Sequence, residues 1–204
     1  ETGSAIRPVS LTESEASAWT DAIRPESSPE FLIAKAGMRY LGQAADTYLV
    51  LAVQDGVVLV DQHAAHERIL LHRLKNSARP APRGLLPPLE LGLHPAQQDR
   101  LEDLWTELSA LGFQLATPRP GLVQIQGVPE HLEPRQAREF LSAALDGQAA
   151  DMETLWTMMA CKTAIKAGQP LARSEALLLL ETWLECPNRA FCPHGRPIMV
   201  RLGA

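Results

Sequence analysis

The chain lacks the features that mark secreted, membrane-spanning or disordered proteins. Its 204 residues include 3 cysteines, too few for a disulfide scaffold, and no apolar segment typical of a signal peptide precedes them. Its longest purely apolar runs, such as 49–53 and 177–180, are far shorter than the roughly 20 residues that a membrane span needs. Gly (13) and Pro (16) are too few for a low-complexity chain. We therefore expect a soluble, cytoplasmic protein whose thiols are free for packing or metal binding.

Positive charge is also scarce. Lys and Arg total 19 against 24 for Asp and Glu, which gives a net charge of −5. No overall field attracts nucleic acid, so any contact with DNA must be local. The length fits one domain or two lobes that share a core. Because the chain opens at Glu1 rather than Met, we expect it to be a piece of a longer protein.

Hydrophobic periodicity organises the first third of the chain. Residues 1–30 contain three prolines and six serines with little periodicity, which predicts a flexible linker. Three β-strands are expected next, at 37–44, 48–54 and 57–61. An Asp55-Gly56 pair joins the last two strands and is a strong hairpin signal. Good helix formers follow from Ala64 on, so Asp61 and His63 lie at a strand-to-helix junction.

Four prolines and a glycine between residues 77 and 88 predict a boundary between two lobes. The next elements are expected in the order β-α-β-β-α, at 85–93, 95–110, 113–116, 122–126 and 134–145. Helices at 152–167 and 174–184 then lead to a closing strand at 197–202, which we expect to rejoin the first sheet. We predict an α/β protein of the α+β type. A lobe with a mixed sheet, from residues 31–78 and 152–204, carries a smaller inserted lobe, 79–151.

Asp61, His63 and Glu67 form a compact set of metal-ligand types. Asp61 and His63 are two residues apart, and Glu67 follows His63 by one helical turn. Oxygen and nitrogen ligands of this kind suit a divalent cation. The alternative is structural, with Asp61 as the N-cap of the helix and Glu67 as a solvated acid in its first turn.

Cys192 and His194 supply a second pair of ligand types, a thiolate and an imidazole two residues apart in a loop stiffened by Pro and Gly. Zinc accepts this mixture of sulfur and nitrogen, and two such pairs would complete four ligands. The alternative is that a single cysteine is a small core residue. Cys161, within an otherwise apolar helix, fits that alternative on its own.

Three motifs, in this order and spacing, resemble the metal-site motifs in the C-terminal domain of MutL mismatch-repair endonucleases. They are Asp61-Gln62-His63-Ala64-Ala65-His66-Glu67, Ala160-Cys161-Lys162 and Cys192-Pro193-His194-Gly195-Arg196-Pro197. The resemblance covers residues 31–202, and the start of the chain resembles the linker to the family's N-terminal ATPase domain. It implies a dimerisation lobe that contains the metal site and an inserted regulatory lobe. The implied activity is metal-dependent nicking of one strand of duplex DNA by a homodimer.

The resemblance makes Glu67 the central ligand, which reaches or bridges two metals. The implied metal ligands are Asp61, His63, Glu67, Cys161, Cys192 and His194, with Asp61, His63 and Glu67 as the catalytic residues. We expect zinc, manganese or both, with the carboxylates favouring a catalytic manganese and the thiolates a structural or regulatory zinc. Two departures stand out. His72 replaces a second Glu of the family motif, and Met199-Val200-Arg201 is the nearest remnant of a terminal Phe-x-Arg motif.

Two further surfaces are expected beside the motifs. The basic residues Arg68, Arg73, Lys75 and Arg79 predict contacts with duplex DNA, although a solvated helix face is the alternative. Leu85, Leu86 and Pro87 resemble the segment by which the family docks to the replication sliding clamp, with Arg83 in place of the usual Gln. The alternative for this segment is an edge strand blunted by prolines.

The apolar helix at 176–184 predicts more apolar surface than one small lobe buries, which favours a symmetric homodimer. A MutS-type mismatch sensor is expected to act through the full-length protein. Against the enzyme stands a non-catalytic, zinc-stapled dimerisation module that joins two ATPase arms. A stand-alone zinc hydrolase of small substrates would need a deep pocket and has no support in the sequence.

Overall fold

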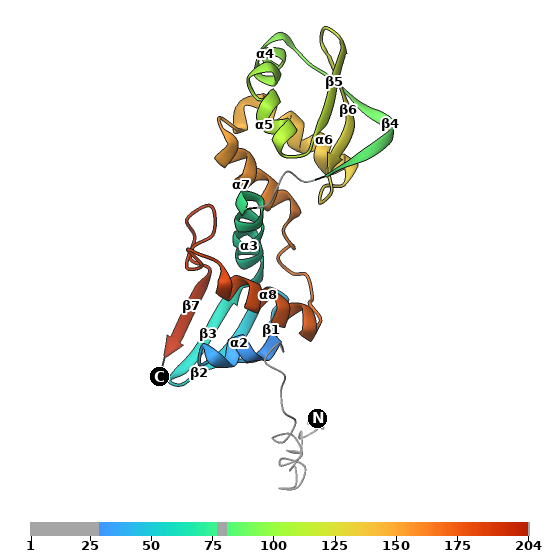
Figure 1. Ribbon diagram of the computed structural model, residues 1–204. Coiled ribbons are helices and arrows are strands. Elements are labelled where there is room, and N and C mark those ends of the chain that lie inside the picture. Colours follow the sequence, from blue (N-terminus) through green and yellow to red (C-terminus); the bar gives the residue numbers. More distant parts are fainter. Residues whose placement is uncertain (1–28, 77–80, 204) are drawn as a thin grey trace, which may run out of the picture.

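The computed structural model describes residues 29–76 and 81–203, which form two antiparallel sheets with helices packed around them (Figure 1). The first sheet has the order β1-β2-β3-β7, from β1 (Arg39–Ala44), β2 (Tyr48–Val53), β3 (Gly56–Asp61) and β7 (Met199–Gly203). The second has the order β4-β6-β5, from β4 (Pro82–Gly92), β5 (Gln114–Arg119) and β6 (Leu122–Pro129). The predicted α+β class is confirmed.

The helices fall into three groups (Figure 1). Beside the first sheet lie α2 (Pro29–Lys35) and α8 (Arg173–Glu185). Between the two sheets, α3 (Gln62–Asn76) and α7 (Met152–Thr163) pack against each other. Around the second sheet lie α4 (Pro95–Asp103), α5 (Trp105–Ala110), α6 (Pro134–Ala143) and a π-helical turn, η1 (Ala144–Gln148).

The first sheet is antiparallel throughout, so the expectation of a mixed sheet was wrong. Tight hairpins join β1 to β2 and β2 to β3, and such hairpins produce antiparallel pairs. Strand β7 returns along β3 in the opposite direction, which confirms that the closing strand rejoins this sheet.

The hairpin turn between β2 and β3 lies one residue earlier than predicted. Val53 pairs with Gly56, so Gln54 and Asp55 form the turn. Gly56 has φ +136°, and a Cβ atom there would lie 2.1 Å from the carbonyl oxygen of Leu202. The glycine is therefore needed for the close approach of β7.

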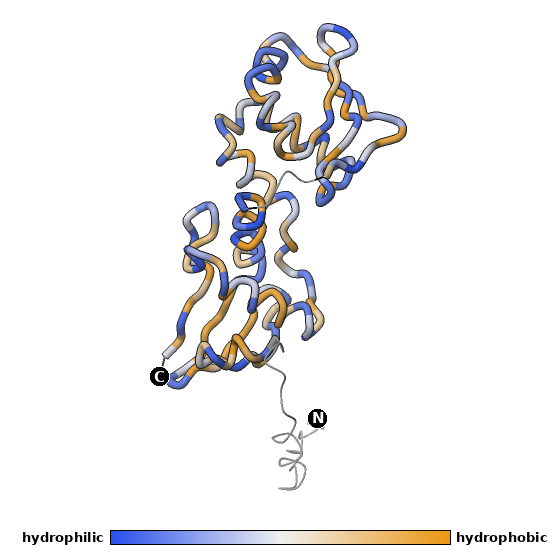
Figure 2. Tube along the Cα trace, in the orientation of Figure 1, coloured by the Kyte–Doolittle hydropathy of each residue, from blue (hydrophilic) through white to orange (hydrophobic). Residues whose placement is uncertain are grey.

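Each sheet has its own hydrophobic core. Leu49, Val60, Leu180 and Trp183 are buried in the first core, where β2 and β3 carry the apolar runs visible in Figure 2. In the second core, Phe113 and Phe140 stack with their ring centroids 5.5 Å apart. Helix α7 adds Leu155 and Met159 to this second core while it also packs against α3. The helix thus connects the two sheets, and the lobe boundary at 151/152 stays a prediction.

Several helices differ from expectation. Helix α2 was not predicted, and it begins inside the segment 1–30 that we interpreted as a linker, the rest of which lies outside the described residues. The helix expected at 95–110 breaks at Leu104 into α4 and α5. The helix expected at 152–167 ends at Thr163. Within 29–76 and 81–203, no helix is long and apolar enough to cross a membrane.

Candidate metal centre

Asp61, the last residue of β3, caps the helix that follows it. Its Oδ1 accepts a hydrogen bond from the backbone N–H of Ala64 at 3.0 Å. This satisfies one of the free N–H groups at the start of α3, as an N-cap residue does. Asp61 does not belong to the group of described side chains whose ligand atoms lie close together around Glu67.

Glu67 lies at the centre of the cluster and is 4% exposed. His63, one helical turn earlier on α3, places its Nε2 at 3.3 Å from Glu67 Oε1. The other ring nitrogen, Nδ1, lies 2.7 Å from the carbonyl oxygen of Ile165. A carbonyl oxygen only accepts, so Nδ1 donates to it, and Nε2 faces Glu67. Histidines that bind metals are oriented by a second hydrogen bond of this kind.

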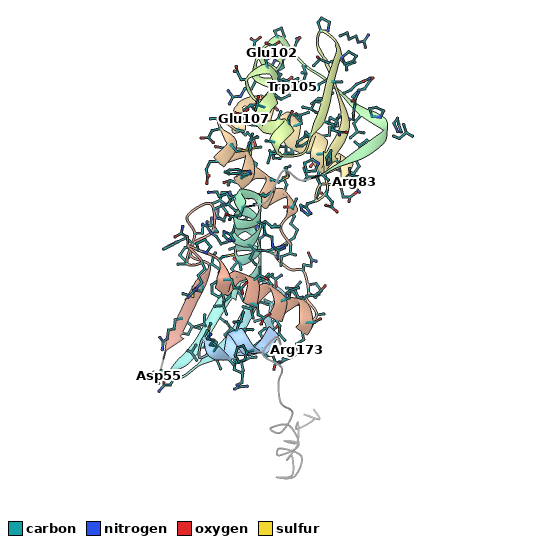
Figure 3. The ribbon with its side chains drawn as sticks, viewed as in Figure 1. Asp55, Arg83, Glu102, Trp105, Glu107 and Arg173 are labelled. Carbon is teal, nitrogen blue, oxygen red and sulfur yellow. The ribbon has the colours of Figure 1, made fainter. Side chains whose placement is uncertain are left out.

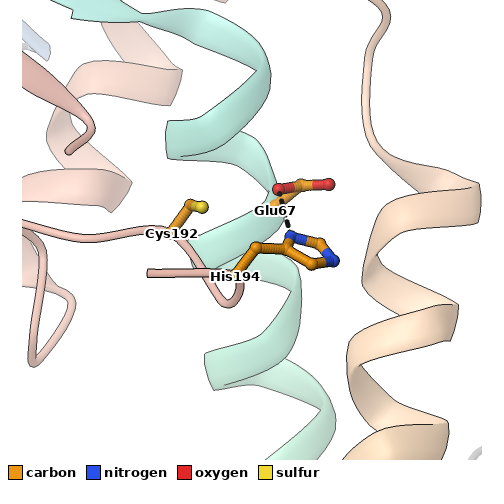
Figure 4. A group of neighbouring side chains, drawn as sticks. All are labelled: Glu67, Cys192 and His194. Carbon is orange, nitrogen blue, oxygen red and sulfur yellow. Dashed lines mark ion pairs between the residues drawn. The ribbon is translucent and has the colours of Figure 1, made fainter. Parts of the chain in front are cut away.

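A loop before β7 brings Cys192 and His194 to the same place (Figure 4). The backbone N–H of Cys192 donates to the carbonyl of Arg196 at 2.8 Å, which closes the loop. His194 Nδ1 lies 3.5 Å from Glu67 Oε2. Glu67, Cys192 and His194 each offer a ligand atom, and these atoms all lie within 4.8 Å of one another. The three side chains could therefore hold a metal ion.

Cys161 on α7 completes this group of side chains. Its thiol donates to Glu67 Oε1 at 2.7 Å, and its Sγ lies 3.3 Å from His194 Nε2. Burial and the hydrogen bond and charge of Glu67 raise the pKa of the Cys161 thiol to about 12. A cation beside a thiol acts in the opposite direction, because it favours the thiolate.

The structure thus gathers five of the six predicted ligand residues, from α3, α7 and the loop before β7. They are His63, Glu67, Cys161, Cys192 and His194. The sixth, Asp61, caps α3. His72, which stands where the resemblance expects a Glu, lies about two and a half turns of α3 after His63 and contacts Asn76. Arg201, from the remnant of the terminal motif, lies on β7 opposite Val58.

Two of the predicted DNA-contact residues are engaged in packing. Arg68 Nε donates to the carbonyl of Phe191 at 2.8 Å and so ties α3 to the loop that carries Cys192. Lys75 pairs with Glu153 and lies over the ring of Trp156 on α7. Arg73 is exposed. Arg79 lies outside the described residues.

The predicted clamp segment interrupts the second sheet. The pairing of β4 with β6 shifts register between Gly84 and Leu89, and Leu86 in this interval is 99% exposed. Leu85 packs against the second core, and Pro87 is exposed. Arg83, labelled in Figure 3, donates to the carbonyl of Leu132 at 2.8 Å.

Sequence reasoning missed Gln62 and His66, which support the centre from α3. Gln62 is fully buried, and its Nε2 donates to the carbonyls of Asp46 and Gln169, each at 2.8 Å. His66 Nδ1 accepts a hydrogen bond from Ile165 N at 3.0 Å. Burial, with the nearby charge of Arg73, lowers the pKa of His66 to about 4. The one signal for them in the sequence is their position, because Gln62 stands between Asp61 and His63 and His66 directly precedes Glu67.

The fold and the cluster define a class of protein: a two-sheet α+β domain with a carboxylate, two thiols and two imidazoles gathered beside one helix. The family model of the MutL C-terminal dimerisation domain matches residues 41–171. The chain belongs to this family, and so to the MutL proteins of DNA mismatch repair.

Curated relatives of the chain are also MutL proteins. The DNA mismatch repair protein MutL of Thermus thermophilus is 37% identical over 171 residues, which covers 81% of this chain and 30% of the relative. MutL of Anaeromyxobacter dehalogenans is 36% identical over 193 residues, covering 87% of this chain and 31% of the relative. MutL of Kosmotoga olearia is 34% identical over 168 residues, covering 78% and 28%. The chain therefore spans about a third of the length of these relatives.

Proposed function

We propose that this domain is the part of a MutL protein that dimerises and, with a bound metal, nicks one strand of duplex DNA during mismatch repair. The observation that carries the proposal is the convergence of metal-ligand side chains around Glu67. A buried carboxylate needs a compensating positive charge. Two thiols and two imidazoles around it are the donors that complete a metal site.

The donor set fits zinc or manganese. Thiolate and imidazole are preferred zinc ligands, whereas carboxylate oxygen suits manganese. Glu67, Cys161, Cys192, His194 and His63 would hold the metal, and Asp61 at the end of β3 is a further proposed ligand. A metal held by these residues would supply an activated water and would stabilise the charge that develops on the oxygens of a phosphodiester.

The protein's own groups prepare this chemistry. His63 is held by the Ile165 carbonyl with Nε2 toward Glu67. Arg68 fixes the loop that bears Cys192. His194 is 46% exposed, so the centre opens to solvent on the side where a polymer substrate can approach. Arg73 is proposed to contact the DNA backbone, since its side chain is exposed on the same helix as Glu67.

We propose that two copies associate through the outer face of the first sheet. Core side chains Val58 and Val60 alternate along β3 with Val57 and Leu59, which are only partly buried. The strand register places Leu59 beside Val200 and Val57 beside Leu202. This face is therefore apolar and uncovered among the described residues, as dimer interfaces are.

Helix α8 does not supply the apolar surface that we expected for dimerisation. Its residues Ala176, Leu177, Leu179, Leu180 and Trp183 are buried in the first core. Only Leu178 is an exposed large apolar residue on this helix. The sheet face, rather than α8, therefore supports the homodimer.

The remaining partners follow from family membership and one exposed segment. We propose that an N-terminal ATPase domain precedes this domain in the full-length protein and that a MutS-type mismatch sensor acts through it. The almost fully exposed Leu86, with Leu85 and Pro87, is proposed to dock to the sliding clamp.

The test is Glu67→Gln in the full-length protein, assayed by manganese-dependent nicking of supercoiled plasmid at low salt. The matched control is Glu102→Gln, which makes the same change on the exposed surface of α4 (Figure 3). We expect nicking to be lost in Glu67→Gln and kept in Glu102→Gln, with the dimer intact in both. Full activity of a folded Glu67→Gln variant would refute the proposal.

The zinc-stapled dimerisation module remains the second candidate, because thiols and imidazoles alone make a structural zinc site. It predicts that the wild-type protein does not nick DNA, whichever divalent metal is added, while removal of zinc lowers the stability of the domain. Those two results together would favour the dimerisation module over the endonuclease.

A further inference from the structure

The connection between α7 and α8, residues 164–171, is held by side chains of other elements; we call it the connector. Three residues at the start of α3 bind its backbone. Gln62 donates to the carbonyl of Gln169, His63 donates to the carbonyl of Ile165, and His66 accepts from the N–H of Ile165. A fourth side chain, Gln43 on β1, donates to the Gln169 carbonyl and accepts from the N–H of Leu171. The connector is thus fixed to the helix that carries Glu67.

A turn inside the connector sets the position of Lys166. The N–H of Gln169 donates to the carbonyl of Lys166 at 3.3 Å. Gly168, the third residue of this turn, has φ +80°, as a type II turn requires. The Gln169 side chain accepts from the N–H of Lys166 at 3.4 Å, which closes the turn from its other side.

From this turn the Lys166 side chain reaches back to the metal centre. Its Nζ donates to the carbonyl of Cys161 at 3.3 Å. The ammonium charge is near enough to the Cys161 thiol to oppose the rise of that thiol's pKa. The side chain is exposed, and across 29–76 and 81–203 it forms no ion pair with a carboxylate.

Three other cations near the centre are engaged. Arg68 donates to the Phe191 carbonyl, Lys75 pairs with Glu153, and Lys162 lies 3.6 Å from a carboxylate oxygen of Glu139. An ammonium group with a carboxylate partner contributes less to phosphate binding, because that partner competes for it. Lys166 has donor capacity left, since an ammonium group has three donors and one is used.

We infer that Lys166 contacts a backbone phosphate of the DNA strand at the Glu67 centre and so positions that strand for nicking. The inference rests on the proposed function, and it adds a phosphate contact from the connector to the one proposed for Arg73 on α3. The side chains from α3 and β1 hold the connector so that the ammonium group of Lys166 lies beside Cys161, whose thiol contacts Glu67.

The test uses Lys166→Ala, Lys166→Arg and the matched control Lys35→Ala in the full-length protein. Lys35 is an exposed lysine on α2, beside the first sheet, so its variant removes the same charge away from the centre. DNA affinity is measured over a series of salt concentrations, together with KM and kcat for nicking and the metal content of each variant.

We expect Lys166→Ala to weaken DNA binding about tenfold, the factor for losing about 1.4 kcal/mol of charge-assisted hydrogen bonding. The slope of log affinity against log salt should fall by about one. KM should rise more than kcat falls, Lys166→Arg should restore both, and metal content should stay unchanged. Lys166→Ala behaving like Lys35→Ala, or losing its metal, would overturn the inference. Because DNA affinity is measured without nicking, failure of the proposed endonuclease is seen separately.

Discussion

Gln62→Leu should destabilise the domain strongly, although Gln62 is not a metal ligand. The side chain is fully buried and hydrogen-bonds the turn before β2, the connector and Gln43. Leucine has similar size but leaves the Asp46 carbonyl without its side-chain donor and the Gln169 carbonyl with Gln43 alone. A polar group that loses its partner in the interior costs about 1–3 kcal/mol. One orphaned carbonyl and one weakened one, in partly buried hydrogen bonds, give an expected loss of about 2 kcal/mol in the free energy of unfolding.

The assay is equilibrium unfolding in urea followed by far-ultraviolet circular dichroism on metal-free protein. Gln124→Leu is the control, because that amide bonds Glu90 at the exposed surface of the second sheet. We expect the control to change the unfolding free energy by less than about 0.5 kcal/mol. A Gln62→Leu variant as stable as this control would refute the assignment of the connector's stability to Gln62.

Three further predictions follow from the same geometry. Asp61→Ala should cost about 1 kcal/mol of stability in thermal unfolding through loss of the cap on α3, whereas Asp61→Asn should keep the cap; equal losses would contradict the capping role. Burial lowers the pKa of His66 from 6.5 to about 4. Between these two pH values the folded chain binds fewer protons than the unfolded chain, so the free energy of unfolding should fall as the pH falls from 6.5 to about 4. His66→Gln should flatten this pH dependence, and His131→Gln, at an exposed site, should not. Identical pH profiles of stability for the two variants would count against the role of His66. Val200→Lys on the outer sheet face should shift the dimer to monomer in light scattering, whereas Leu178→Lys, at an equally exposed site on α8, should leave it dimeric; the reverse result would assign the interface to α8.

Local patterns in the sequence were enough to predict the elements of both sheets. Alternating and apolar runs marked β1 to β3, and the composition change after Asp61 marked the start of α3. The same local reasoning missed the end of α7. Residues after Thr163 are good helix formers, but their backbone groups are bound by Gln62, His63 and Gln43, which are distant in the sequence.

In the candidate site, too, contacts between residues close in the sequence were predictable, and contacts between distant residues were not. The approach of His63 to Glu67 was predictable, because one helical turn separates them. The contact of Cys161 with Glu67 joins residues 94 positions apart and depends on the packing of α7 against α3. Only the family resemblance indicated it. The capping bond of Asp61 was the structural alternative, and the geometry shows it.

The most direct test of the Glu67 centre is a titration of the metal-free chain with cobalt, a spectroscopic substitute for zinc, followed by optical absorption. Thiolate ligands give a sulfur-to-cobalt charge-transfer band, so the spectrum reports the cysteines themselves. Cys186→Ser is the control, because Cys186 is buried in the first core and donates to the Thr182 carbonyl. We predict a saturable band in the wild type and in Cys186→Ser that is reduced in Cys192→Ser and in Glu67→Gln. No band in the wild type, or an undiminished band in Cys192→Ser, would contradict a metal centre at Glu67.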